Sequence, residues 1–502
     1  MPLYTYPDIS RTQDVSGRIV ASMPQGFGSG AAAYTTIRQA ASVSLHYLPR
    51  ACCDLRLVFN GVSRAASPPS EASFNAIEVA ASVTVVTSKT DLTELSARMP
   101  VWFGQSRLGL VMPTARIESN IVGAYFPAGT WIKVITYSNR LQTPAQTVFG
   151  ETGRLPATSS NWPQMLYLGG ALNTNAVLGS EINTTDTFST SLPAKVDSGN
   201  PTVTQSTAGY TPAAIIGRTL DSSNIRPVVI FGDSISMGSN DQARTDEEFS
   251  GRGYILAALG HTFPCYQASN SGLAVQYLVG NYRYNWRLRQ PDAARCEVAY
   301  VSLGTNDGAT GRTAQQIKDD LATFFDDLRK IGIKKIVAGT QICRNTTTDG
   351  LTSTGNQTEA GGAGFNAKMT SVNDWLLSSA QVEAIIENRT PMQTSLTSEK
   401  FALSTVFGTN TVAAGSTTTV VNVGTNLTAS ALVGKCVLIG TESRLVSSNT
   451  TTAFTAGTAY GSTPTTSAAI TILNQVCDDG VHPTNVGHRA MQANVDLTKF
   501  YL

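Results

Sequence analysis

Between residues 224 and 400, short apolar runs alternate with stretches of helical periodicity. Pro227–Phe231, Val298–Leu303 and Lys335–Gly339 are apolar without alternation, which is typical of strands buried on both faces. Thr313–Ile331 carries apolar residues three and four positions apart, the spacing of an amphipathic helix. Strands that alternate with helices predict a parallel sheet with helices on both faces. This part of the chain is therefore expected to be an α/β domain.

The chain before this region has a different pattern, with a period of two. Asp54–Phe59, Ile77–Val85 and Trp131–Tyr137 are short runs rich in β-branched residues, each bounded by turn-forming residues. They predict antiparallel strands, and a jelly-roll-like β-sandwich is the natural way to bury them. Residues 150–222 are rich in Ser, Thr, Asn and Pro, so we expect long loops and a connector there.

A second β-rich stretch interrupts the end of the α/β region. Residues 401–472 are rich in Thr and Gly and show almost no helical periodicity, whereas residues 484–502 have the spacing of a last helix. The predicted organisation has four segments: an N-terminal β-rich domain with its connector (1–222), the first part of the α/β domain (223–400), a small inserted β module (401–472), and the final part of the α/β domain (473–502).

Composition excludes several classes of protein. Charged residues make up 14% of the 502 residues and the net charge is +1, whereas a nucleic-acid-binding protein usually has a strongly basic surface. No apolar run is long enough to cross a membrane, and the N-terminal residues lack the basic start and apolar stretch of a secretory signal peptide. We therefore expect neither a nucleic-acid partner nor a membrane span.

The cysteines and histidines do not predict a metal site. Seven cysteines and four histidines are present, and no two cysteines have the C-x-x-C spacing. Buried free thiols are the expected state of the cysteines, with a single disulfide left open. We expect no metal and no cofactor.

A candidate nucleophile follows the first buried strand of the α/β region. Ser234 comes directly after Pro227–Phe231 and Gly232-Asp233, and open α/β folds place their sites at the carboxyl ends of such strands. A serine hydroxyl needs a base to take its proton. The sequence offers four histidines for this role: His46, His261, His482 and His488.

His482 is the best placed of the four. It lies in a turn-rich loop before the last helix, and Asp479 is three residues earlier, close enough to hold one ring nitrogen. Asp478 is a competing candidate for the acid. The predicted catalytic residues are Ser234, His482 and Asp479.

Stabilisation of negative charge on the substrate requires hydrogen-bond donors near Ser234. Gly272, in Asn270-Ser-Gly272, follows the second strand and can present a backbone N–H. Asn306, in Gly304-Thr-Asn306-Asp307, follows the third strand and offers an amide. Together with the backbone N–H of Ser234, these groups form the predicted oxyanion hole. Asp307 and Asp233 are interpreted as structural.

Four blocks of sequence carry a resemblance to a known family. Gly232-Asp-Ser234, Asn270-Ser-Gly272, Gly304-Thr-Asn306-Asp307 and Asp479-Gly-Val-His482-Pro483 resemble, in the right order, the SGNH (GDSL-type) hydrolase superfamily. The resemblance covers about residues 224–400 and 473–502. It implies a flavodoxin-like three-layer α/β/α fold, and ester hydrolysis by Ser234, His482 and Asp479 without metal or cofactor. The chain departs from the family where residues 401–472 intervene, and we expect this module to border the substrate cleft.

The expected function is that of a serine esterase that removes short acyl groups, most simply acetyl groups, from a polysaccharide. Three alternatives are open: a phage tail or tailspike-associated polysaccharide deacetylase, a lipase or lysophospholipase-type esterase, and a carbohydrate-binding structural protein with an inactive hydrolase domain. The expected partner is an acetylated polysaccharide or another small ester, and a homo-oligomer is left open. An extracellular or virion-associated location is expected, with the cytoplasm as the alternative.

Aromatic side chains in the N-terminal region add one open question. Trp102, Trp131 and Trp162 either stack on sugars or belong to the core, and tryptophans of β-sandwiches belong more often to the core. We therefore expect them in the core.

Overall fold

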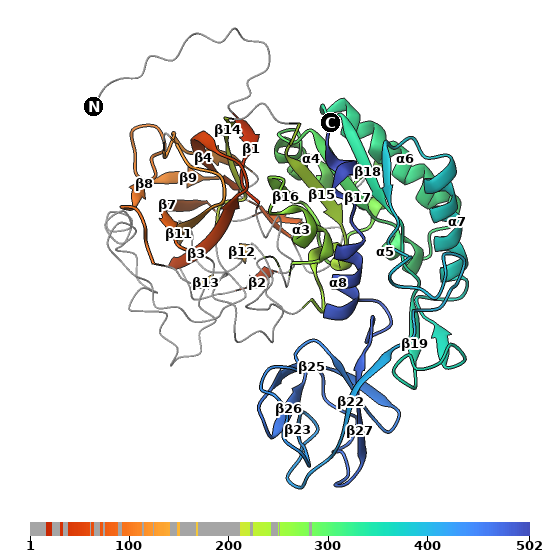
Figure 1. The fold of residues 1–502 in the computed structure, drawn as a ribbon. Coiled ribbons are helices and arrows are strands. Elements are labelled where there is room, and N and C mark those ends of the chain that lie inside the picture. The colour runs from red at the N-terminus through yellow and green to blue at the C-terminus, as the bar shows by residue number, and fades with distance from the viewer. Residues whose placement is uncertain are drawn as a thin grey trace.

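The structure is a computed structural model of the 502-residue chain (Figure 1). The residues that it describes are 17–22, 31–33, 39–60, 62–64, 71–73, 76–88, 93–112, 115–123, 125–140, 148–150, 167–168, 211–220, 224–241, 249, 252–280 and 284–502.

A five-stranded parallel sheet forms the centre of the molecule. Its strands are β15 (Val228–Gly232), β16 (Cys265–Gln267), β17 (Val298–Ser302), β18 (Lys335–Gly339) and β21 (Ala384–Ile386). They lie in the order β16-β15-β17-β18-β21, and every pair is parallel. This is the doubly wound order 2-1-3-4-5, in which the chain reverses its winding direction between β15 and β17. The carboxyl ends of these two strands are where such a fold places its site.

Helices cover both faces of this sheet, as expected from the sequence (Figure 1). Val229 and Phe231 of β15 pack toward one face, and Val228 and Ile230 pack toward the other. The first face is covered by α4 (Tyr284–Ala293), α6 (Ala314–Lys330) and α7 (Phe365–Ser378), and the second by α3 (Tyr254–Leu259), α8 (Asn485–Ala493) and the 3₁₀ turn η5 (Leu497–Phe500).

Two antiparallel sheets precede this domain. The first has the order β1-β14-β4-β10, and the second has the order β13-β3-β11-β7-β8, with β9 also paired to β7. Side chains from the two sheets, such as Phe59 and Val83, share one core cluster. The strands are β1 (Arg18–Ile19), β3 (Gln39–Leu48), β4 (Cys52–Asn60), β7 (Ile77–Val86), β8 (Met99–Pro100), β9 (Gly109–Val111), β10 (Arg116–Glu118), β11 (Thr130–Arg140), β13 (Tyr167–Leu168) and β14 (Ala214–Thr219). The likeness to a jelly roll stays a prediction.

Three short strand pairs are also present, two within the N-terminal region and one that follows strand β18. They are β2 (Ala31–Ala33) with β12 (Val148–Gly150), β5 (Val62–Arg64) with β6 (Glu71–Ser73), and β19 (Asn345–Thr347) with β20 (Gln357–Glu359).

Strand β14 corrects one expectation. It lies within residues 150–222, which we expected to form loops and a connector, yet it is an inner strand of the first sheet, paired with both β1 and β4. Ala214, Ile215 and Ile216 are all buried, so this short strand lacks the alternation that identifies a strand with one exposed face. Most of the rest of the expected connector lies outside the described residues.

Of the two candidate tryptophans that the structure describes, one belongs to the core. Trp131 on β11 is buried, whereas Trp102 is 42% exposed with Arg107 lying over its ring. Trp162 lies outside the described residues.

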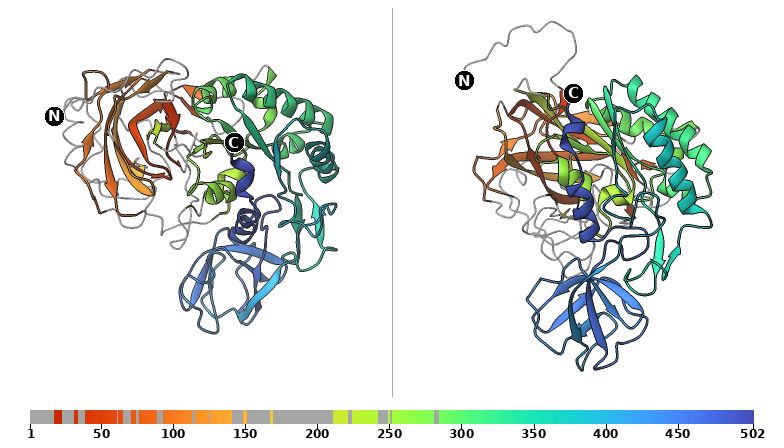
Figure 2. Two further views of the ribbon diagram at one scale, coloured as in Figure 1. Left: turned by 45° about the horizontal axis from the view of Figure 1, so that its top comes forward. Right: turned by 45° about the vertical axis from the view of Figure 1, so that its right-hand side comes forward.

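The β module follows the parallel sheet and has a core of its own, centred on Val421, Val437, Phe454 and Ile472. Its strands are β22 (Thr405–Thr411), β23 (Val420–Asn422), β24 (Cys436–Ile439), β25 (Glu442–Asn449), β26 (Ala453–Ala456) and β27 (Ala469–Asn474). They form an antiparallel sheet in the order β22-β27-β24-β25-β26-β23. Val412, just past β22, bridges to Val423, just past β23, so the sheet curls until its two edges meet. All views show this module as a separate lobe (Figure 2).

Two further properties concern the whole described chain. All seven cysteines are free thiols and all are buried. Among the helices that the structure describes, none combines the length and apolar character that a membrane crossing requires.

Candidate active site

Ser234 lies where strand β15 turns into the short helix α2 (Ser234–Met237). The Asp233 carboxylate accepts a hydrogen bond from the Ile235 N–H (2.9 Å) and so caps this helix. A Cβ atom at Gly232 would lie 2.2 Å from Ser236 Oγ, so the close approach of strand and helix requires glycine at this position. The turn holds Ser234 at the carboxyl end of the sheet, with 6% of its surface exposed.

The predicted base and acid meet Ser234 in the expected order. His482 Nε2 lies 2.8 Å from Ser234 Oγ, and His482 Nδ1 lies 2.7 Å from Asp479 Oδ2. The other Asp479 oxygen accepts the backbone N–H groups of Val481 (2.9 Å) and His482 (2.7 Å). The aspartate therefore shapes the turn that carries the histidine, and it also orients the imidazole. Partial desolvation raises the pKa of Asp479, but hydrogen bonds from His482 outweigh it and hold the pKa below its usual value.

The neighbouring Asp478 points elsewhere. Its carboxylate accepts a hydrogen bond from the Leu445 N–H (3.2 Å) and lies 3.7 Å from Cys436 Sγ, both in the β module. Burial raises the pKa of Asp478 to about 6. Of the two candidate acids, the structure thus pairs Asp479 with His482.

The other three histidines do not reach Ser234. His46 is buried in β3, where burial lowers its pKa to about 3, and its Nε2 lies 2.7 Å from Ser44 Oγ. His261 packs against the ring of Phe249. His488 is buried in α8, with Nε2 3.0 Å from the Ser239 carbonyl.

Two of the predicted oxyanion donors, Gly272 and Asn306, lie on a loop and on a short helix that contact each other. The loop with Gly272 starts beside the nucleophile turn, because the Asn270 N–H donates to the Gly232 carbonyl (3.0 Å). Gly272 has a φ of 71°, a left-handed conformation that favours glycine. Asp307 secures the far end of this loop by accepting the N–H groups of Val275 (2.9 Å) and Gln276 (3.0 Å), which begin the 3₁₀ turn η3 (Val275–Tyr277).

Asn306 lies in the short helix α5 (Thr305–Ala309), and two contacts orient its amide. Its Nδ2 donates to the Leu273 carbonyl (3.1 Å), and its Oδ1 accepts from Arg344 Nη2 (3.3 Å). An amide nitrogen carries two N–H groups, so the second one remains for a ligand. Asn306 is thus locked to the Gly272 loop on one side and to Arg344 on the other.

Two residues of the site were not predicted. Asn240 Nδ2 donates to Asp479 Oδ2 (3.3 Å), and no sequence pattern around Asn240 predicts this contact. Arg344 follows strand β18 just as Asn306 follows β17, so its position at the carboxyl end of a parallel strand was a usable signal.

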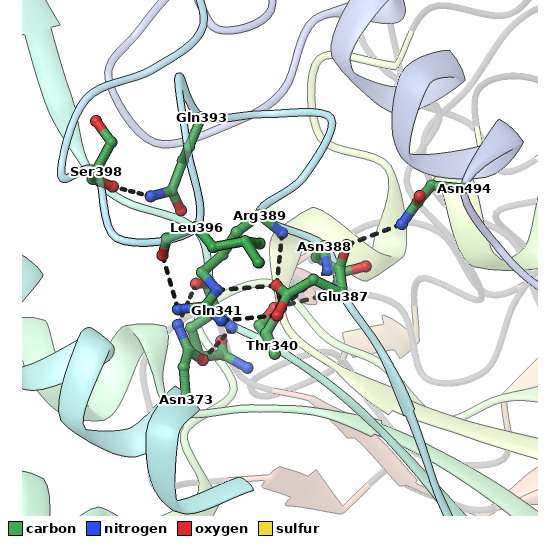
Figure 3. Close-up of polar contacts among 10 residues, drawn as sticks. All are labelled: Thr340, Gln341, Asn373, Glu387, Asn388, Arg389, Gln393, Leu396, Ser398 and Asn494. Atoms are coloured by element: carbon green, nitrogen blue, oxygen red, sulfur yellow. Dashed lines mark hydrogen bonds and ion pairs between the residues drawn. The ribbon is translucent and has the colours of Figure 1, made fainter. Parts of the chain in front are cut away.

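A polar network fixes the chain where it leaves the sheet for the β module (Figure 3). Arg389 forms an ion pair with Glu387 (2.7 Å) and donates to the Leu396 carbonyl (2.9 Å), and Thr340 Oγ1 donates to Glu387 (2.5 Å). Asn494, directly after α8, donates to the Glu387 carbonyl (2.8 Å). The start of the insertion is therefore tied to the helix that follows the His482 loop.

The described residues contain no group of three or more His, Cys, Asp or Glu side chains arranged to hold a metal ion. The chemistry available at Ser234 is that of a serine, a histidine and an aspartate with amide donors nearby.

Comparison with known families agrees with this geometry. The GDSL-like lipase/acylhydrolase family matches residues 230–386, which contain Ser234, Gly272 and Asn306. Residues 230–386 are a GDSL-like hydrolase domain. The family comprises lipases and acylhydrolases, so the reaction of this hydrolase domain is ester or acyl hydrolysis. His482 and Asp479 lie beyond the matched segment, and their assignment rests on the distances given above.

Several solved structures resemble part of the chain. A lipolytic protein of the G-D-S-L family from Veillonella parvula is 18% identical, over 33% of this chain and 79% of its own, with a TM-score of 0.23. A variant of an acetyl xylan esterase from Geobacillus stearothermophilus is 14% identical, over 34% of this chain and 80% of its own, with a TM-score of 0.22. A Bacillus subtilis protein is 11% identical, over 75% of this chain and 80% of its own, with a TM-score of 0.27. Likeness this remote says nothing about the substrate. No curated protein matches the chain.

Proposed function

We propose that the protein is a serine esterase that works through an acyl-enzyme. The observation that carries the proposal is the position of His482, whose ring lies within hydrogen-bond distance of both Ser234 Oγ (2.8 Å) and Asp479 Oδ2 (2.7 Å). A neutral imidazole in this position can take the serine proton as the oxygen attacks a carbonyl carbon. Asp479 then stabilises the imidazolium that forms.

The remaining steps follow from the same residues. The N–H groups of Ser234 and Gly272 and the amide of Asn306 stabilise the negative charge on the former carbonyl oxygen. His482 returns its proton to the departing alcohol, which leaves the acyl group on Ser234. A water molecule, deprotonated by His482, then attacks this ester, and the acid leaves as Ser234 regains its proton.

We propose that the substrate is a short acyl ester, an acetyl ester above all, on a polysaccharide. Asn240 hydrogen-bonds to the triad and Arg344 to Asn306, and these polar side chains favour a hydroxyl-rich alcohol over a long hydrocarbon chain. The β module adjoins the catalytic turn through Asp478, which supports a role in holding an extended substrate. A polysaccharide substrate fits an extracellular or virion-associated place of action.

Substitution of the nucleophile tests the reaction. Ser234→Ala should abolish hydrolysis of p-nitrophenyl acetate, because no other group in the site can form the acyl-enzyme. A serine-directed fluorophosphonate should add one phosphonyl group to the parent protein and none to the variant, as measured by intact mass. Ser447→Ala is the matched control, since this serine is buried in the β module and donates only to the Thr455 carbonyl (3.0 Å). Turnover by Ser234→Ala within tenfold of the parent would refute the assignment.

A chain-length series tests the substrate class. The kcat/KM for p-nitrophenyl esters should fall from acetate to octanoate, because the polar surroundings provide little apolar surface for a long acyl chain. A preference for octanoate would favour the lipase alternative instead.

A further inference from the structure

Arg344 carries a positive charge that the protein itself leaves almost unpaired. Only 7% of the residue is exposed, and in the described part of the chain its guanidinium forms no ion pair. Its single side-chain hydrogen bond there is the one from Nη2 to Asn306 Oδ1 (3.3 Å), and the buried Nε has no acceptor. The guanidinium lies over the ring of Phe365, 5.0 Å from its centroid. Of the five N–H groups of an arginine, at most one is therefore used.

Such a group is costly unless it has a function. A buried charge needs a partner of opposite sign, and an arginine left without one loses its hydration for little return. Burial lowers the pKa of Arg344, although the more distant charges of Asp233 and Asp479 act in the opposite direction. Neither carboxylate forms an ion pair or a hydrogen bond with Arg344 in the described part of the chain; Asp233 accepts from the Ile235 N–H, and Asp479 holds His482.

Arg344 also lies beside the reacting groups. On one side it contacts Asn306, a predicted oxyanion donor. On the other side the next residue, Asn345, donates its N–H to the carbonyl of Gly480 (3.1 Å), in the turn between Asp479 and His482. The guanidinium thus contacts the oxyanion side of the site, and the backbone that follows Arg344 is bonded to the histidine side.

We propose that Arg344 binds a carboxylate of the substrate, so that the ester cleaved here is carried by an acidic sugar. The inference rests on the esterase function proposed above and adds the class of alcohol to it. A guanidinium offers parallel N–H donors that match the two oxygens of a carboxylate, and the described protein uses at most one of the donors of Arg344. The substrate then supplies the anion that the protein omits.

The parent protein provides the first test. Acetate release is measured on O-acetylated galacturonan with free carboxylates, and on the same polymer after methyl esterification, which removes the charge but keeps the sugar and the acetyl group. We expect kcat/KM to be at least about tenfold higher on the charged polymer, the size of one charge-assisted hydrogen bond. This preference should shrink as salt is added, because the attraction is screened. Equal rates on the two polymers would overturn the inference.

Variants of Arg344 provide the second test, with the ratio of the two rates as the readout. Arg344→Gln should bring the ratio close to one. Arg344→Lys keeps the charge but loses the paired N–H donors, so its ratio should lie between one and that of the parent protein. Any loss through Asn306 affects both polymers equally and cancels in the ratio. Arg329→Gln on α6 is the control, because it also removes one positive charge. The partners of Arg329, Glu383 and the Gln381 carbonyl, lie before strand β21, away from the carboxyl ends of the strands.

The outcomes separate the inference from the function on which it rests. If Arg344→Gln lowers both rates equally and keeps the ratio, Arg344 only orients Asn306 or balances the charge of Asp233, and the inference is wrong. If the parent protein and Ser234→Ala release acetate equally slowly from both polymers, the esterase proposal itself fails.

Discussion

Asn306 illustrates how single contacts prepare the site. One N–H of its amide is used by the Leu273 carbonyl, and its oxygen is used by Arg344. Because the oxygen is held by Arg344, the group of this amide that remains for a ligand is the second N–H of its nitrogen. Donors held in place in this way stabilise developing charge without reorganising during the reaction.

Replacement of this side chain should affect the reaction more than the fold. We expect Asn306→Ala to lower kcat for p-nitrophenyl acetate by about 10²–10³-fold, the usual effect of losing one oxyanion donor. Asn494→Ala is a control, since this amide donates only to the carbonyl of Glu387, which precedes the insertion in the chain. A kcat within tenfold of the parent would show that Asn306 is not a donor to the oxyanion.

Among the elements, the loop between β27 and α8 carries Asp479 and His482 and is held at both of its ends. Its first half is tied to the β module, where Asp478 holds the Leu445 N–H and Ser443 Oγ donates to Gln475 (2.8 Å). Its second half is tied to α8 by Thr484, whose hydroxyl caps the helix at Gly487. The Asp479–His482 turn lies between these two anchors. The inserted module is therefore part of what places the histidine.

The raised pKa of Asp478 makes the stability of the folded protein depend on pH. Because its folded-state pKa of about 6 lies above the usual value of 3.8, the folded protein binds the proton more tightly than the unfolded chain. The stability contributed by the protonated form is present below about pH 4 and is lost as the pH rises through 6. Asp478→Asn removes this dependence. Between pH 4 and pH 7, the free energy of unfolding of the variant should therefore rise by about 1–3 kcal/mol relative to that of the parent.

Thermal unfolding of the parent and of Asp478→Asn at pH 4.5 and pH 7 measures this effect. The difference in Tm between the two proteins should shift in favour of the variant at the higher pH. A difference that is independent of pH would contradict the raised pKa.

At the scale of the whole molecule, the N-terminal sheets are joined to the hydrolase domain by buried polar contacts. Asp292 on α4 forms an ion pair with Arg116 of β10 (2.7 Å) and accepts hydrogen bonds from Asn60 of β4 (3.3 Å) and Tyr266 of β16 (3.3 Å). Nearby, Glu297 pairs with Arg18, at the start of the first sheet. The apolar core is also continuous across this boundary. We therefore expect these two parts to unfold together.

Loss of the central carboxylate should destabilise both parts at once. Asp292→Ala leaves the half-buried Arg116 without its main partner and leaves Asn60 and Tyr266 without their acceptor, which costs about 3–5 kcal/mol of unfolding free energy. Urea denaturation followed by fluorescence measures this cost, and the double variant Asp292→Ala, Arg116→Ala should recover part of it. Additive effects of the two substitutions would show that the ion pair contributes no coupling.

Much of the hydrolase domain follows from local patterns. Strand β17 and helix α6 lie within one residue of the ranges read from apolar runs and from spacings of three and four residues, because buried parallel strands and amphipathic helices leave these signals. The same patterns failed for β14, whose burial is decided by pairing with β4, a strand more than 150 positions earlier in the chain. Asn240 could not be found either, since its role depends on a contact with Asp479 from the opposite end of the domain.

The sequence by itself determined the alternation of strands and helices in the hydrolase domain and the candidate site residues Ser234, Asn306 and His482, because these are properties of short segments. Only the tertiary structure decided which of two adjacent aspartates holds His482, since the choice depends on Asp478 being taken by the β module. It also brought Arg344 against Asn306. Both outcomes depend on contacts between segments far apart in the chain, which form only when the parallel sheet gathers the ends of its strands at one edge.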